Sequence, residues 1–133
     1  MAANIAPIFA LTPETVRTRI TGTTTDKTGS TTANIVNLVT ASTEGTKVTW
    51  IKFKHVGNSS AGLYLIWITD TSGSNPRLYA ELTISAVTSS GTVATNENTL
   101  FTPDLQLKSG QKIQVGATTA TTNIDVLASI GNF

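Results

Sequence analysis

Short runs of alternating apolar and polar residues, rich in Val, Ile and Thr, recur along most of this chain. The clearest run spans residues 47–56, where Ile51 and Phe53 share one parity and Lys52 and Lys54 share the other. A period of two is typical of a β-strand with one buried face. β-branched side chains are stiff at χ1 and pack well on a pleated surface. The pattern therefore predicts an all-β fold.

Clusters of Gly, Ser, Asn and Pro, which form turns, separate the expected strands. These strands span residues 16–21, 33–39, 47–56, 63–70, 77–85, 93–101, 111–117 and 123–130, with 103–110 as a connector. Parallel strands would need helix-length crossovers, which are missing, so the strands should pair antiparallel. Their number and spacing predict a jelly-roll-like antiparallel β-sandwich. We divide the chain into an extended N-terminal arm, residues 1–14, and a single β-sandwich domain, residues 15–133.

The composition excludes several classes of function. Charged residues make up only 13% of the chain, and the formal net charge is +1. Nucleic-acid-binding proteins usually carry a strong basic footprint, so we expect no nucleic-acid partner. The chain has no cysteine and one histidine, which excludes disulfides, zinc thiolate sites and a multi-histidine site within one chain. We therefore expect no metal and no cofactor. No apolar run approaches the roughly 20 residues of a membrane-spanning helix, so no membrane partner is expected.

Two motif-like segments fit turns better than they fit chemistry. The run DKTGS at residues 26–30 matches the phosphorylation motif of P-type ATPases, in which an Asp after an apolar strand is the nucleophile. Here Gly22 and three threonines precede Asp26 instead. The run DTSGS at residues 70–74 has the alternating oxygens of a calcium loop but a single carboxylate. Asp, Gly and Ser favour turns, so we expect both runs to form loops.

The side chains of His55 and Trp67 are expected in the interior. His55 shares the parity of Ile51 and Phe53, and no nucleophile or carboxylate partner can be identified for it. We therefore expect a partly buried structural histidine and no enzymatic activity. Trp67 lies in the most apolar run and should pack in the core.

Trp50 is the aromatic residue that the pattern places on the solvent side, because it shares the parity of Lys52 and Lys54. These three residues form a possible surface binding site. Arg17 and Arg19 could extend it into a modest basic patch, although a solvated charged face is the usual explanation for such residues.

The N-terminal segment is apolar and carries Pro7 and Pro13, which disfavour a continuous helix and extend the residues before them. An apolar arm is unfavourable in water, so we expect it to dock on its own body or on a neighbour. The residues expected to make these contacts are Ile5, Pro7, Ile8, Phe9 and Leu11.

The run MAANIAPIF at residues 1–9, followed by LTP at 11–13, resembles the start of small virion proteins encoded by tailed bacteriophages. The Thr- and Ala-rich body and the Gly-containing end at residues 124–133 are similar to that group as well. The resemblance implies a capsid decoration or cement protein, commonly a homotrimer, on the outer surface of the virion. Its partners would be other copies of the chain and the major capsid protein, with the arm making the contacts.

Two other functions fit the same residues. A carbohydrate-binding or host-adhesion module of a virion fibre would use Trp50, because aromatic rings stack on sugars. A structural component of the tail or neck would assemble with ring symmetry instead of as trimers. The sequence leaves the choice between head and tail open.

Overall fold

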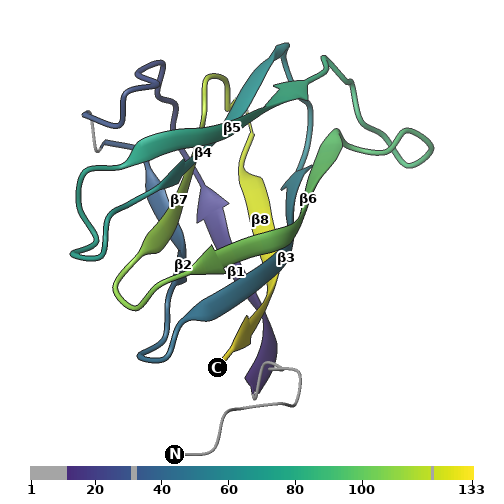
Figure 1. Cartoon of the computed structure of the whole chain (residues 1–133). Helices are drawn as coiled ribbons and strands as arrows, with labels where there is room; N and C mark the ends of the chain where they lie inside the picture. Colours follow the sequence, from purple (N-terminus) through teal and green to yellow (C-terminus); the bar gives the residue numbers. More distant parts are fainter. Residues whose placement is uncertain (1–11, 31–32, 121) are drawn as a thin grey trace, which may run out of the picture.

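The computed structural model describes residues 12–30, 33–120 and 122–133. Within these residues the regular secondary structure consists of eight β-strands without a helix (Figure 1). The strands are β1 (Thr12–Ile20), β2 (Val36–Thr40), β3 (Thr46–His55), β4 (Gly62–Ile68), β5 (Arg77–Ile84), β6 (Glu97–Leu107), β7 (Lys112–Ala117) and β8 (Ile124–Asn132). None of these residues belongs to a helix long and apolar enough to cross a membrane.

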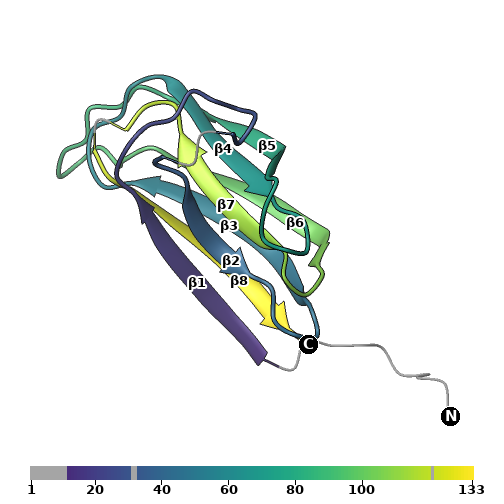
Figure 2. The same ribbon diagram turned by 90° about the vertical axis from the view of Figure 1, so that its left-hand side faces the viewer.

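The strands form two antiparallel sheets packed face to face (Figure 2). One sheet has the order β1-β8-β3-β6, and the other has the order β2-β7-β4-β5. The chain passes from one sheet to the other at every connection except that between β4 and β5. This is the jelly-roll arrangement, in which two Greek keys form a double sheet. The predicted antiparallel β-sandwich is confirmed.

The hydrophobic core lies between the two sheets and is built from alternate residues of each strand. Phe53 of β3 stacks on Tyr64 of β4, with ring centroids 4.6 Å apart and an interplanar angle of 19°. Ile51, Ile66 and Val126 belong to the same cluster and are fully buried. Burying each such side chain contributes about 1.5–3 kcal/mol. The face of β3 that alternation marks as apolar is therefore the one that packs against the other sheet.

β3 changes face at Thr49. In the pairing with β8, Val48 and Trp50 lie opposite consecutive residues, so Thr49 is an extra residue and forms a β-bulge. Val48 is buried before the bulge, and Ile51 is buried after it. Treating residues 47–56 as one regular strand misses this change. The bulge explains why Val48 and Trp50, although of equal parity, lie on opposite faces.

β6 is longer than expected and contains Pro103. Residues 103–110 were predicted as a connector, which is wrong for residues 103–107 because the strand continues through them. The pairing with β3 is interrupted around Pro103, and there Thr102 turns inward and donates from Oγ1 to the Val48 carbonyl at 2.9 Å. Proline lacks an N–H group, so a strand tolerates it at an edge or a bulge, and this site is both.

β1 begins at Thr12, earlier than the expected residue 16. Residues 12–14, assigned to the arm by the sequence, pair with β8 in this strand. The rest of the expected arm lies outside the described residues. That segment includes all five expected contact residues, Ile5, Pro7, Ile8, Phe9 and Leu11. Their contacts stay a prediction.

The loop between β1 and β2 packs on the outer face of the second sheet. Trp67, on that face of β4, is fully buried and donates from Nε1 to the Lys27 carbonyl at 3.0 Å. The N–H of Thr24 donates to the Ala117 carbonyl at 2.9 Å, and Lys27 pairs with Glu81 of β5 at 2.6 Å. Trp67 is therefore interior, as expected, but it lies beneath this loop instead of between the sheets.

Gly116 of β7 leaves the space that the Trp67 ring occupies. A Cβ atom at Gly116 would lie 3.1 Å from Cζ3 of Trp67 and 3.1 Å from Cγ2 of Thr24. Both distances are shorter than ordinary van der Waals contact. A side chain at this position would push the loop away from the sheet.

Both motif-like runs form turns, as expected. The carboxylate of Asp26 accepts the N–H of Thr28 at 2.9 Å. The carboxylate of Asp70 accepts the N–H groups of Ser72 and Ser74, each at 3.0 Å. The Ser72 hydroxyl also donates to Asp70 and is the largest cause of a strongly lowered pKa for this carboxyl group. These carboxylates are occupied by turn hydrogen bonds, which is the common role of Asp in a loop.

Candidate interaction surface

The two outer faces of the sandwich differ. Under the β1–β2 loop, the outer face of the second sheet buries Leu65 and Trp67 completely. On the outer face of the sheet β1-β8-β3-β6, the side chains in three successive cross-strand rows are exposed or half-buried. We call these residues the open sheet face: Thr15, Arg17, Arg19, Lys47, Trp50, Lys52, Lys54, Glu97, Thr99, Phe101, Asp125, Leu127 and Ser129, with Lys47 adjoining the rows.

An aromatic pair lies within the open sheet face. Trp50 of β3 and Phe101 of β6 are cross-strand partners. Phe101 is 72% exposed, more than any other large hydrophobic residue described, and Trp50 is half-buried. Leu127 of β8, in the next row, is half-buried as well. Grouped apolar surface of this kind is unfavourable in water and indicates a site of interaction.

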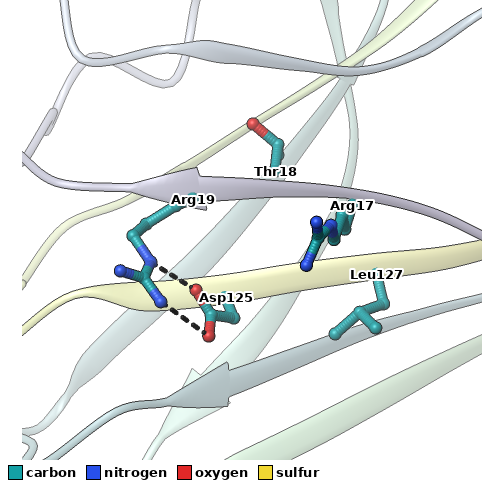
Figure 3. A pocket seen from close by; sticks show the side chains of 5 residues that line it. All are labelled: Arg17, Thr18, Arg19, Asp125 and Leu127. Carbon is teal, nitrogen blue, oxygen red and sulfur yellow. Dashed lines mark hydrogen bonds and ion pairs between the residues drawn. The ribbon is translucent and has the colours of Figure 1, made fainter.

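The open sheet face carries two clusters of paired charges. Arg19 binds Asp125 through two contacts, Nε–Oδ1 at 2.6 Å and Nη2–Oδ2 at 3.1 Å (Figure 3). This hydrogen bonding lowers the pKa of the Asp125 carboxyl group and raises that of Arg19. Lys52 Nζ lies 3.0 Å from Glu97, and its hydrogen bond is the main cause of a lowered pKa for that carboxyl group. Lys54 lies 3.8 Å from the same carboxylate.

Arg17 and Lys47 form no ion pair within the described part of the chain. Arg17 lies opposite Leu127 in the pairing of β1 with β8. With Thr18, Arg19 and Asp125, these two residues line a shallow depression of about 370 Å³ (Figure 3). In Figure 3 the side chains of Arg17 and Leu127 project to the same side as Asp125, beside its pair with Arg19. The charge of Arg17 contributes to the lowered pKa of Asp125, but its guanidinium makes no ion-pair contact in the described residues and can donate to a carboxylate on another molecule.

The charge of the molecule is unevenly distributed. The open sheet face holds five basic side chains and two carboxylates, whereas the whole chain has a net charge of only +1. The other charged residues therefore have a net negative charge. Such a distribution orients the open sheet face towards negatively charged partners and speeds their encounter.

The structure brings the proposed surface residues together. Trp50, Lys52 and Lys54 lie on one face of β3, and Arg17 and Arg19 of β1 lie on the same side of the sheet, with β8 between the two strands. Phe101 and Leu127, the other two large apolar residues of the surface, were not among the residues predicted from the sequence. Their odd numbers place them in the outward parity of their own strands, but only the strand register shows which residues they adjoin.

His55 is an interior residue, only 1% exposed. Its Nδ1 lies 2.7 Å from the Tyr64 hydroxyl, which also accepts a hydrogen bond from Asn96 Nδ2 at 2.8 Å. Burial lowers the pKa of His55. The expectation of a partly buried structural histidine understates its burial. The position gives the ring no access to a substrate in solution.

Among residues 12–30, 33–120 and 122–133, no three His, Asp or Glu side chains gather as metal ligands.

Comparisons with known proteins return little. No family model matches the chain. No curated protein matches it. Among solved structures it is similar to a chain described as "Cyanophage Pam1 capsid asymmetric unit", with a TM-score of 0.45 and 16% sequence identity. That similarity covers 99% of this chain and 94% of the other.

Proposed function

We propose that this chain is a cement or decoration protein of a tailed-phage head, which binds the lattice of the major capsid protein through its open sheet face. The observation that carries the proposal is the aromatic pair Trp50 and Phe101 on a cationic sheet face, while on the opposite face the loop covers Trp67. The N-terminal resemblance supports the same function. No catalytic step is assigned, and the burial of His55 is in keeping with that.

The energetics favour docking by this face. Burying an aromatic side chain such as Phe101 contributes about 1.5–3 kcal/mol, although association has its own entropic cost. Arg17 and Lys47 would meet carboxylates of the shell, which adds orientation and speed of encounter more than affinity. Many copies on one lattice then multiply a modest affinity through avidity. A rigid sandwich suits this role because little order has to be gained on binding.

The finer form of the proposal comes from the N-terminal resemblance. The protein would lie on the outer surface of the virion as a homotrimer, with the N-terminal arm holding the copies to one another or to the shell. Apolar burial would provide the binding energy of the arm. The residues with this role are Ile5, Pro7, Ile8, Phe9 and Leu11.

The test uses heads of the encoding phage assembled without this chain, to which purified protein is added. We expect the protein to cosediment with the heads and to raise the temperature at which they release DNA. Phe101→Asp should weaken both effects, because a carboxylate replaces the apolar contact on the open sheet face. Tyr79→Asp is the matched control, since Tyr79 is a 45% exposed aromatic residue on β5 of the other sheet. Absence of cosedimentation, or equal loss in both variants, would contradict the proposal.

The same aromatic pair also favours a second candidate, a carbohydrate-binding adhesion module. Trp50 is half-buried and lies opposite Ser129 in the pairing of β3 with β8, so a small side chain is its neighbour on that strand. A sugar stacked on that ring would change the fluorescence of Trp50, and Trp50→Phe would abolish the change. Titration with surface polysaccharide of the host bacterium measures this. If the fluorescence does not change although the same protein binds heads, the adhesion function is excluded and the capsid function remains.

A further inference from the structure

The four edge strands of the sandwich differ in how they are protected. The ladder of β6 is broken around Pro103, and that of β5 around Tyr79. β2 is only five residues long and its register shifts at Leu38. Bulges, short length, proline and charged side chains are among the devices by which proteins prevent edge strands from pairing with other chains. Three of the four described edges have a bulge, an interrupted register or a short length.

β1 has neither a bulge nor a short length, although it carries Pro13 and three charged side chains, Glu14, Arg17 and Arg19. Its nine residues pair with β8 in one unbroken register, from Thr12–Asn132 to Ile20–Ile124. Its single proline, Pro13, stands at the second position, where at most one backbone hydrogen bond per copy is lost. Figure 2 shows β1 at the outer margin of the sandwich, and among the described residues no strand lies beyond it. Such an edge offers a row of backbone donors and acceptors to another strand.

We propose that β1 pairs antiparallel with β1 of a second copy of this chain, about a twofold axis through Val16. The two four-stranded sheets would join into one continuous sheet, and the two open sheet faces would lie side by side. A twofold contact of this kind closes after two copies, so it is distinct from the contact that a trimer requires. It therefore stands or falls independently of the proposed trimer and of capsid binding.

The register follows from the pleat. Residues directly opposite in an antiparallel pair project to the same face, so inward residues must meet inward residues. A twofold axis satisfies this only when it passes through a residue. Placing it at Val16 pairs all the residues of β1, Thr12–Ile20, with their counterparts, whereas an axis at Thr15 or Arg17 leaves residues at one end unpaired.

The charges favour the same register. With the axis at Val16, Arg17 faces Thr15 of the other copy, and Arg19 faces Pro13. With the axis at Arg17, this guanidinium would face its own counterpart, and with the axis at Thr18, Arg17 would face Arg19. Like charges directly opposite are destabilising in a sheet. Of the axes compared, the one at Val16 therefore pairs every residue of β1 without placing two cations directly opposite each other.

Disulfide trapping tests the register directly, because the chain has no cysteine of its own. Thr15→Cys and Arg17→Cys chains, mixed and exposed to a mild oxidant, should form a disulfide-linked dimer, since opposite Cα atoms lie about 4.5–5.5 Å apart. Each variant alone should stay uncrosslinked. A mixture of Thr15→Cys with Arg19→Cys should also fail, because that diagonal is about 7–8 Å. Equal crosslinking in all mixtures, or in none, would overturn the proposal.

Solution mass provides an independent measurement on the full chain. Thr15→Glu places a carboxylate opposite Arg17 at two symmetric positions and should tighten the twofold contact roughly 2- to 30-fold. Thr15→Lys should weaken it by a comparable factor. Thr99→Lys is the control, because Thr99 is also a threonine on the open sheet face but lies in β6, at the opposite edge of the sheet from β1. Sedimentation equilibrium that yields one association constant for all four proteins would refute the contact.

Discussion

Between about pH 7.5 and about pH 5.5, acidification should destabilise this protein mainly through one side chain, the buried His55. The Tyr64 hydroxyl accepts a hydrogen bond from Asn96, and we assign its own proton to His55 Nδ1, which then acts as the acceptor. The neutral ring then carries its proton on Nε2, a buried atom for which the described residues offer no hydrogen-bond partner. Adding a second proton at Nδ1 would break the bond from Tyr64 and place a charge in the core. Both effects oppose protonation, and burial lowers the pKa.

The magnitude follows from proton linkage. The unfolded chain binds a proton near the ordinary histidine pKa of about 6.5, whereas the folded chain resists it. The contribution of His55 is therefore fully present above about pH 6.5 and is lost as the pH falls towards the lowered folded pKa. Between about pH 7.5 and about pH 5.5 the loss reaches at most about 1.4 kcal/mol. This corresponds to roughly 5 °C in the melting temperature of a domain of this size.

Urea unfolding at several pH values in this range measures the effect. His55→Asn is the matched variant, because the Asn carbonyl can accept from Tyr64 but does not titrate. Carboxylates contribute equally to both proteins at the acidic end, so the difference between the two curves isolates His55, the only histidine of the chain. Parallel curves for parent and variant would refute the assignment of a neutral buried ring.

Two further predictions concern packing of the β1–β2 loop. Gly116→Val should lower the free energy of unfolding by about 1–3 kcal/mol, because its side chain would collide with Trp67 and Thr24. Gly91→Val is the control: a Cβ atom there meets no atom within 4 Å, so the free energy of unfolding should change by less than about 0.5 kcal/mol. Urea unfolding measures both variants, and equal effects would contradict the packing. Iodide in solution should quench the fluorescence of Trp50 but not that of the buried Trp67. The tryptophan fluorescence of Trp50→Phe should therefore be nearly insensitive to iodide. Persistent quenching in this variant would mean that the loop does not shield Trp67.

Alternation predicted the faces of the strands well, because the core between two sheets rewards a period of two. Ile51 and Phe53 are buried and Lys52 and Lys54 are not, as the pattern indicates. It failed where a local event breaks the period. The bulge at Thr49 and the strand around Pro103 depend on hydrogen bonds to neighbouring strands, which no local pattern specifies.

The candidate surface was predictable in part for the same reason. Trp50, Lys52 and Lys54 share one strand, so their grouping follows from parity. Phe101 and Leu127 join them only through the register of β3 with β6 and β8, which is set by the whole sheet. The burial of Trp67 under a loop was not predictable either. Its apolar run indicates burial but does not identify what covers it.

The order of strands in the two sheets bears on how a newly made chain reaches this fold. The central strands β8 and β7 lie between β1 and β3 and between β2 and β4, yet both follow all the other strands along the chain. Neither sheet can close on the ribosome before residues 112–132 have emerged, which takes a few seconds at about 5–20 residues per second. Until then β1–β6 expose unpaired strand edges, the state most prone to aggregation. The yield of soluble protein should therefore depend more on the rate of translation and the temperature during synthesis than on additives that stabilise the finished sandwich.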